Sequence, residues 1–176
     1  MALYRFRIDL SDIDRGVYKN LDLRIAMHPS EAFPYLLTRV IAFALNEREN
    51  LEFSPGGLSD PDAPCIRSVE RDGTTSLWIE VGNPSAKKLH KAAKAATMVK
   101  VYTYKDPENL LREMRGHKIH NVEQIEIFSL KPELLERLTA TLQRDNRWGL
   151  VHTDGSLVFS VGDRTEQGEV FRVQLP

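Results

Sequence analysis

The spacing of apolar residues changes twice within residues 77–104, from that of a strand to that of a helix and back. This stretch constrains the fold more than any other part of the chain. Leu77–Val81 is a largely apolar run typical of a strand, and apolar residues between Ser85 and Ala96 recur at helical spacing. The segment MVKVYTY that follows is again typical of a strand. A strand, a turn, a helix and a strand in this order form a crossover, whose two strands run parallel. We therefore predict a mixed sheet flanked by helices, with this crossover at its centre.

Strand and helix patterns also alternate along the rest of the chain. Residues 2–10 and 18–27 alternate apolar and polar side chains and are close in sequence, which favours an antiparallel pair. Residues 65–71 and 76–82 flank the turn-forming stretch DGTT and predict a hairpin. The remaining expected elements are a helix opening at Ser30, a short helix at 106–115, a strand at 123–130, a helix at 131–144, a hairpin turning at Asp154-Gly155 and a last strand at 168–175.

Side chains predict where two of these helices begin. Ser30 is a suitable N-cap, and Glu31 would then lie in the first turn, near the positive end of the helix dipole. Pro34 is tolerated because it lies close to the helix start. Asp106 precedes Pro107, a residue favoured at the first helical position, so the short helix is expected to begin there.

The bulk properties of the chain predict one soluble domain of mixed α/β class over residues 1–176. The length allows a substantial core, 41% of the residues are hydrophobic, and the formal net charge is −1. This charge excludes a strongly basic nucleic-acid coat but not a local basic patch. Cys65 is the only cysteine, which excludes an intramolecular disulfide. No signal peptide is recognisable and no apolar run approaches the roughly 20 residues needed to span a bilayer, so we expect a cytoplasmic protein.

Two carboxylates have contexts that suggest a metal site. Asp62 lies in the proline-rich loop 54–64 just before a strand, and Glu80 ends the strand that follows. A hairpin would bring both to one end of the sheet, where two carboxylates suit a hard divalent cation such as Mg²⁺ or Mn²⁺. Each acid also has a purely structural interpretation. Asp62 is typical of a turn, and Glu80 fits an edge position or a salt bridge, because an unpaired charge is costly to bury.

The helix predicted at 85–96 carries a second signal in its lysines. Positions 83–105 contain six lysines and no acidic residue. Lys87, Lys91 and Lys94 share one helical face, opposite the apolar residues. One interpretation is a solvated face. The other is a local positive stripe that binds a phosphodiester backbone.

Several segments together resemble the YaeQ family of bacterial proteins. They include RIAMHPSE at 24–31, LLTRVIAFAL at 36–45, GGLSDPDAP at 56–64, LWIEVGNPSAKKLHKA at 77–92 and VYTY at 101–104. The resemblance runs in order over at least the first 104 residues. It implies a compact variant of the PD-(D/E)XK nuclease fold, a superfamily of Mg²⁺-dependent enzymes that cut DNA. The resemblance carries no assigned function for the family itself.

The resemblance also implies roles for three acids. The Pro-Asp pair of the superfamily matches Pro61-Asp62, its second acid matches Glu80, and its first-helix acid matches Glu31. In working members the two central acids hold the metal, which polarises the scissile phosphate and activates water. The first-helix acid assists through the metal or the water. Catalytic roles are therefore expected for Glu31, Asp62 and Glu80, and metal binding for Asp62 and Glu80.

The sequence departs from the superfamily pattern at Gly82, where a lysine is expected. That lysine positions the nucleophilic water and stabilises developing charge. Some members carry it on the following helix instead, and Lys91 is the preferred candidate here, with Lys88 as the alternative. Lys87, Lys88 and Lys94 are then expected to contact the backbone of a nucleic acid.

Three functional hypotheses follow from the sequence. The first is a Mg²⁺-dependent phosphodiesterase or nuclease, which the three acids and the literal Pro-Asp pair favour. The second is a non-catalytic binding or regulatory module that keeps the nuclease fold, which Gly82 and the near-neutral charge favour. The third is a small-molecule enzyme outside this scheme.

Overall fold

The first two strands follow the alternation of the sequence. In the computed structural model, which describes residues 2–56 and 60–175, β1 (Ala2–Asp12) pairs with β2 (Val17–Met27) in antiparallel register. Phe6 lies opposite Leu23, and both side chains are buried. The apolar positions of the two strands thus share one face, which is why this register forms. The predicted antiparallel pair is confirmed.

The chain divides into two compact units, Met1–Glu47 with Leu130–Phe171 (unit 1) and Arg48–Ser129 with Arg172–Pro176 (unit 2). Within unit 1 the strand order is β2-β1-β8-β9-β10, and only the pair β1–β8 is parallel. The remaining elements of unit 1 are α1 (Phe33–Leu45), α4 (Pro132–Thr139), β8 (Asp145–Thr153), β9 (Ser156–Val161) and β10 (Arg164–Val173), whose last two residues belong to unit 2.

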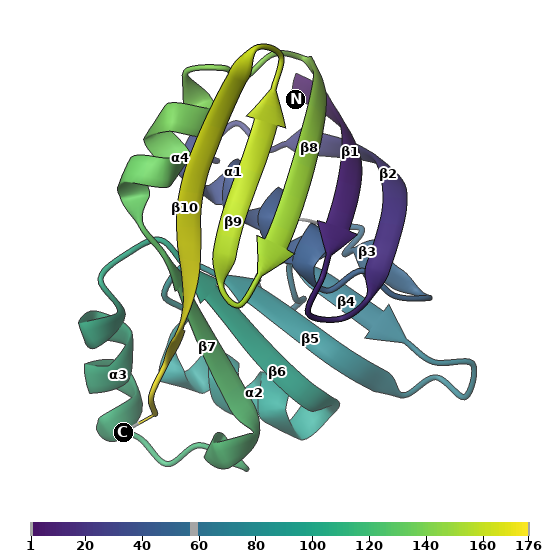
Figure 1. The fold of residues 1–176 in the computed structure, drawn as a ribbon. Helices are drawn as coiled ribbons and strands as arrows, with labels where there is room; N and C mark the ends of the chain where they lie inside the picture. The colour runs from purple at the N-terminus through teal and green to yellow at the C-terminus, as the bar shows by residue number, and fades with distance from the viewer. Residues whose placement is uncertain (1, 57–59, 176) are drawn as a thin grey trace. The chain divides into compact units, whose positions relative to one another are not determined.

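The core of unit 1 forms where helices meet its sheet. Helix α1 is buried along almost its whole length and packs against α4, and Figure 1 shows α1 behind the sheet of this unit. Trp148 packs edge-to-face against Phe6 and Phe159, which joins three strands through their inner faces. The hairpin β8–β9 turns at Asp154-Gly155, as predicted, and both residues have a positive φ there.

Unit 2 contains the predicted crossover. Its strand order is β7-β6-β5-β4-β3, with β3–β4 and β4–β5 antiparallel and β5–β6 and β6–β7 parallel. The crossover β5–α2–β6 joins parallel neighbours, so the parallel pairing predicted for residues 77–104 is confirmed, as is the hairpin before it. The predicted place of the crossover at the centre of the sheet is not confirmed, because β6 and β5 are not the middle pair of the strand order. The elements of unit 2 are β3 (Leu51–Phe53), β4 (Ile66–Val69), β5 (Thr75–Val81), α2 (Ala86–Ala95), β6 (Ala96–Thr103), α3 (Pro107–Arg115), a 3₁₀ turn (Val122–Gln124) and β7 (Ile125–Leu130).

The core of unit 2 fixes which face of α2 points toward the sheet. Leu89 and Ala92 of α2 are fully buried and belong to one apolar cluster with Trp78 of β5 and Leu110 of α3. Small residues on α2 allow the helix to approach the sheet closely. Because side chains alternate along a strand, Glu80 lies on the same face of β5 as Trp78. The sheet face that carries Glu80 is therefore the one that α2 covers.

Two predicted helix ends are wrong. Helix α1 begins at Phe33 with Ala32 as its N-cap, and no side chain caps it. The Ser30 hydroxyl instead contacts the His28 ring, at 2.7 Å, and Glu31 precedes the helix. Helix α4 ends at Thr139, short of the predicted residue 144. There the Thr139 hydroxyl bonds the Leu135 carbonyl, a local hydrogen bond of the kind that competes with helix continuation.

Other boundaries agree more closely with the sequence patterns. Asp106 caps α3 by accepting a hydrogen bond from the Glu108 N–H, and Pro107 opens the helix, as predicted. The last strand begins at Arg164, four residues before the predicted start. Residues 57–59 of the predicted loop lie outside the described residues. The fold class is mixed α/β, as predicted, and the single domain over residues 1–176 stays a prediction.

Candidate functional site

Glu80 is a buried carboxylate with a specific partner for each oxygen. Its side chain is 3% exposed. Oε1 accepts a hydrogen bond of 2.9 Å from the Trp78 indole N–H, and Oε2 lies 3.1 Å from the Lys88 ammonium. Glu80 is the residue before the last in β5, so it lies near the carboxyl end of a parallel strand, where ligands commonly bind in α/β sheets. The salt-bridge interpretation of Glu80 and its place in a site are both compatible with these contacts.

The protonation of Glu80 reflects two opposing effects. Burial raises the pKa of Glu80 above its ordinary value because the charged form loses its hydration. The Lys88 charge and the Trp78 hydrogen bond favour the ionised form and oppose the rise in pKa. A carboxylate with a pKa perturbed by burial and by one specific cation is typical of functional sites, although structural ion pairs show the same effect.

Gly82 has a backbone conformation that explains the absence of a lysine there. Its φ is +88°, and its N–H donates to the Tyr102 carbonyl at 2.9 Å. Apart from the glycine itself and its two chain neighbours, no atom of the described residues lies within 4 Å of a Cβ built at this position, so a Cβ has space. The conformation is the obstacle, because side-chain-bearing L residues rarely adopt it. A lysine at position 82 would therefore strain the chain in this fold.

Helix α2 places two lysines against the two central acids. Ser85 caps the helix by accepting from the Lys88 N–H at 3.1 Å. One turn apart on this helix, the Lys88 ammonium contacts Glu80 and the Lys91 ammonium lies 3.0 Å from Asp62 Oδ1. Both candidates for a relocated lysine thus point toward the acids. The preferred candidate from the sequence, Lys91, meets Asp62, and the alternative, Lys88, meets Glu80.

The Asp62–Lys91 pair is much more exposed than the pair at Glu80. The side chains of Asp62 and Lys91 are 74% and 57% exposed. The hydrogen bond and charge of Lys91 lower the pKa of Asp62, with smaller contributions from the Lys88 and Lys87 charges. The Asp62 backbone N–H donates to the Asp60 carboxylate at 3.0 Å, so the side chain that caps this turn is that of Asp60 and not that of Asp62. Asp62 is therefore ionised, accessible and surrounded by positive charge.

The remaining predicted site residues are Lys87, Lys94 and Glu31. Lys87 and Lys94 are exposed on α2, which is compatible with contact to a backbone phosphate. Glu31 belongs to unit 1, and its carboxylate accepts three hydrogen bonds from the Arg39 guanidinium, at 2.7 to 3.0 Å. Oε1 of Glu31 also accepts from the His28 N–H. These bonds engage both carboxylate oxygens of Glu31. The catalytic role expected for Glu31 stays a prediction.

Trp78 is a site residue that the sequence analysis did not single out. Its indole N–H holds Glu80, and its ring is 6% exposed. The available signal was the spacing of two residues along a strand, which puts both side chains on one face. An aromatic residue in an apolar run usually packs in the core, so the sequence offered no reason to expect that Trp78 also holds Glu80.

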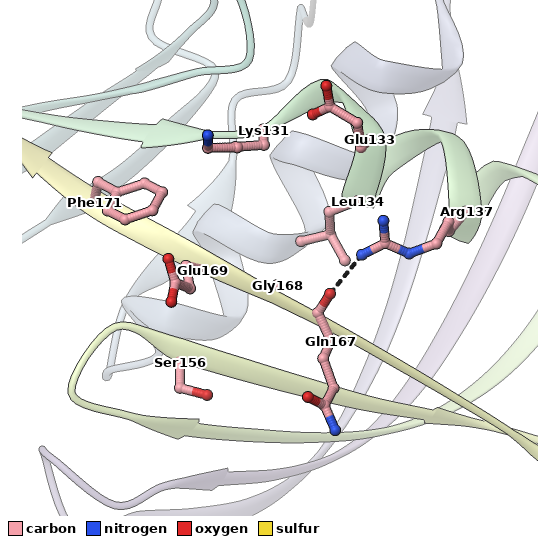
Figure 2. Close-up of a pocket in the computed structure, with 9 residues that line it drawn as sticks. All are labelled: Lys131, Glu133, Leu134, Arg137, Ser156, Gln167, Gly168, Glu169 and Phe171. Carbon is pink, nitrogen blue, oxygen red and sulfur yellow. Dashed lines mark hydrogen bonds between the residues drawn. The ribbon is translucent and has the colours of Figure 1, made fainter.

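A cavity of about 440 Å³ in unit 1 contains none of the predicted site residues. It lies between α4 and β10, and Figure 2 shows Leu134 of α4 beside Gly168 of β10. Its cations are engaged by the protein. Arg137 donates to the Gln167 carbonyl, and the Lys131 ammonium lies 5.9 Å from the centre of the Phe171 ring. The acid and lysine pairs of unit 2 are thus the better candidate site.

Asp62 and Glu80 are the two acids of this site whose oxygens a divalent cation would use, and each is paired with a lysine. Asp62 and Glu80 supply carboxylate oxygens, and Mg²⁺ is usually held by one or two carboxylates, waters and substrate phosphates. Within residues 2–56 and 60–175, no group of three or more His, Cys, Asp or Glu side chains is placed to hold a metal. A cation here would depend on these two acids and on the substrate.

Comparisons with known proteins identify the family. The family model described as "YaeQ protein" matches residues 1–170. The chain is 25% identical over 144 residues to the "Uncharacterized protein YaeQ" of Escherichia coli (strain K12), covering 81% of this chain and 79% of the relative. The corresponding protein of Salmonella typhi is 30% identical over 103 residues, covering 58% of this chain and 56% of the relative.

Two crystal structures share the fold. The YaeQ protein from Pseudomonas syringae superimposes with a TM-score of 0.90 at 26% identity, covering 99% of this chain and 97% of that one. The YaeQ protein from Xanthomonas axonopodis pv. citri gives a TM-score of 0.88 at 28% identity, covering 99% of both chains. The chain belongs to the YaeQ family. In the part of the chain that the structure describes, no helix has the length and apolar character to cross a membrane.

Proposed function

We propose that the chain is a Mg²⁺- or Mn²⁺-dependent phosphodiesterase that acts on nucleic acid, built on a variant of the PD-(D/E)XK fold. One observation carries the proposal. Lys88 and Lys91, one turn apart on α2, lie within 3.1 Å of Glu80 and Asp62, the two acids expected to bind a metal. Metal-assisted phosphodiester cleavage needs acids for the cation and a positive group for developing charge. The positive φ of Gly82, which a lysine would rarely adopt, supports relocation of the lysine rather than its loss.

We assign the relocated lysine to Lys88 rather than to Lys91. Lys88 is 27% exposed and pairs with the buried acid, so its ammonium is held in place more firmly than that of Lys91. A divalent cation on Asp62 and Glu80 would polarise the scissile phosphate. Lys88 would present its positive charge beside Glu80, where negative charge develops during cleavage.

The exposed lysines of α2 provide the surface for the substrate. Lys87, Lys91 and Lys94 lie on the outer face of the helix, and no acidic residue occurs from 83 to 105. Such a stripe suits the regular negative charge of a phosphodiester backbone. With a net charge of −1, the binding surface must be local. Because nucleic acid is the proposed substrate, we propose the cytoplasm as the place of action.

A cleavage assay with matched variants tests the proposal. Single-stranded and double-stranded DNA and RNA are incubated with the protein and Mg²⁺ or Mn²⁺. Glu80→Gln and Lys88→Met should each lose about 100-fold or more in cleavage rate, since each removes a group that acts at the scissile phosphate. Lys118→Met, on an exposed lysine of the same unit, should retain full activity. Cleavage that survives Glu80→Gln would refute this site.

A non-catalytic module that binds nucleic acid is the second candidate. It is favoured by the pairing of each central acid with a lysine, because such pairs can be purely structural. Calorimetric titration with Mn²⁺ separates the two candidates. Binding that disappears in Glu80→Gln supports the phosphodiesterase. If the protein binds DNA or RNA but neither binds Mn²⁺ nor cleaves, the module is correct.

A further inference from the structure

Strand β2 is the outermost strand of unit 1, and its free edge is long. It stands at one end of the strand order, as Figure 1 shows, and its eleven residues pair with β1 without a bulge. The strand contains no proline. Proline, bulges and short length are common means by which proteins prevent pairing at a sheet edge, and β2 has none of the three.

The hydrogen-bonding groups of alternate β2 residues point away from β1. The Arg5 N–H donates to the Arg144 carbonyl at the start of β8, so odd-numbered residues of β1 face β8. Even-numbered residues of β1 therefore face β2, where the register pairs them with odd-numbered residues. The N–H and C=O groups of the even-numbered residues within 18–26 consequently face the open edge. The Ala26 carbonyl agrees with this, because it accepts from the Arg39 side chain at 3.4 Å.

The exposed side chains along this edge are complementary to their own antiparallel reversal. A second copy whose Leu23 lies opposite Leu23 places Asp22 opposite Arg24 on both sides of the two-fold axis. This register also sets even-numbered residues opposite even-numbered residues, so their outward N–H and C=O groups can form the ladder. Moving the axis by one residue leaves even opposite even but puts Asp22 opposite Asp22, or Arg24 opposite Arg24. Like charges disfavour both alternatives.

Arg24 has an electrostatic reason to bind an acid of a second copy. It lies opposite Arg5 of β1, and like charges at opposite positions destabilise a sheet. The Arg5 guanidinium donates two hydrogen bonds to Asp22. The Asp22 side chain is still 48% exposed, and an ionised carboxylate has acceptor sites for a further guanidinium. Asp22 of a second copy would offset the repulsion at Arg24.

The most exposed large apolar side chains of the described residues lie along the same edge of the sheet. Tyr18 is 65% exposed and Leu3 is 61% exposed. Leu3 lies on β1 opposite Ala26 of β2. With Leu23 on the axis, Tyr18 lies diagonally across from Ala26 of the second copy, within reach of an aromatic side chain. Pairing would therefore cover exposed apolar surface at both ends of the edge.

We propose that the chain forms a two-fold symmetric dimer through β2, which joins the unit 1 sheets of two copies edge to edge. The occupant of the edge is a second copy, because charges, apolar side chains and outward backbone groups are complementary in one register. The inference is independent of the proposed function, whose site lies in unit 2. Edge pairing forms a small interface, so we expect a weak dimer with a Kd between about 1 µM and 1 mM.

Sedimentation velocity over a protein concentration range from about 1 µM to about 1 mM tests the dimer. Arg24→Asp should raise the Kd about tenfold or more, because it replaces two attractive pairs by two repulsive ones. Arg24→Lys should keep the dimer. The matched control is Arg147→Asp, on an exposed arginine of the interior strand β8, and it should leave the Kd unchanged. A protein that stays monomeric throughout, or equal effects of the two Asp variants, would overturn the proposal.

Amide hydrogen exchange measured by NMR on the unmodified protein needs no variant and locates the interface. The amides of Asn20, Asp22 and Arg24 should exchange more slowly at concentrations above the Kd than below it. The amides of Leu21 and Leu23 face β1 and should be protected at both concentrations. A dimer whose even-numbered amides exchange equally fast at both would place the interface elsewhere and refute self-pairing. Protection that appears in a monomer only after cell extract is added would assign the edge to another partner, which also refutes it.

Discussion

Substitution of Gly82 tests the reason why the expected lysine is absent from this strand end. Its φ of +88° would be imposed on any replacement, and an added Cβ would meet no atom within 4 Å in the described part of the chain beyond the glycine itself and its two chain neighbours. The cost should therefore come from the backbone alone, about 1–2 kcal/mol for a side-chain-bearing residue in the left-handed region. Gly82→Ala should lose about this amount, and Gly82→Lys should lose at least as much, because it has the same backbone conformation and a longer side chain at a buried position.

The assay is urea unfolding followed by far-UV circular dichroism, which gives the free energy of unfolding of each variant. Gly116→Ala is the matched control, because Gly116 has a φ of −77° and its nearest neighbours lie at 3.7 and 3.9 Å from a built Cβ. At such a compatible position the substitution should stabilise by about 0.4–1 kcal/mol. If Gly82→Lys unfolds at the same urea concentration as the unmodified protein, strain does not explain the missing lysine.

Two further outcomes are expected in unit 1. Gly168→Ala would place its Cβ 2.5 Å from Leu134 Cδ2 and should lower the free energy of unfolding in urea by about 1–3 kcal/mol. This loss should vanish when Leu134 is also replaced by Ala. If the loss persists in the double variant, the predicted clash is wrong. Asp22 should titrate by ¹³C NMR with a pKa of about 2, because Arg5 holds its carboxylate through two hydrogen bonds. Because folding lowers the pKa of Asp22, the Arg5–Asp22 pair stabilises the folded protein fully above about pH 4, the ordinary pKa of an aspartate. This stabilisation is lost as the pH falls through about 2. A midpoint near 4 in the unmodified protein would disprove the pairing, and Arg5→Gln should produce that value.

The secondary structure was largely predictable because local periodicity reflects burial. The crossover over residues 77–104 and the pairing of β1 with β2 follow from patterns with periods near 3.6 and 2. The wrong predictions concern helix ends. Ser30 has the chemistry of an N-cap, but its hydroxyl contacts His28 instead, and the helix begins three residues later. Local propensity cannot rank two competing hydrogen-bond partners of similar strength.

The candidate site was predictable in its residue types but not in its pairings. Asp62 and Glu80 stand out by context, and lysines of α2 were expected near them. Which lysine meets which acid depends on how α2 is rotated and on how far it is shifted along β5. Leu89 and its neighbours fix that rotation by packing against the sheet, and long lysine side chains then reach either acid. The sequence favoured Lys91 for the relocated position, whereas the contact with the buried Glu80 is made by Lys88.

By itself, the sequence determined the order of elements, the parallel crossover and the family, because hydrophobic period and motif are properties of neighbouring residues. Only the tertiary structure decided the chemistry at the strand end. The hydrogen bond from Gly82 to Tyr102 joins two strands, and the positive φ beside it disfavours a lysine at that position. The same packing buries Glu80 between Trp78 and Lys88. The spacing of Trp78 and Glu80 is local, but the burial of Glu80 and its contact with Lys88 depend on how α2 packs on β5, which no local pattern encodes.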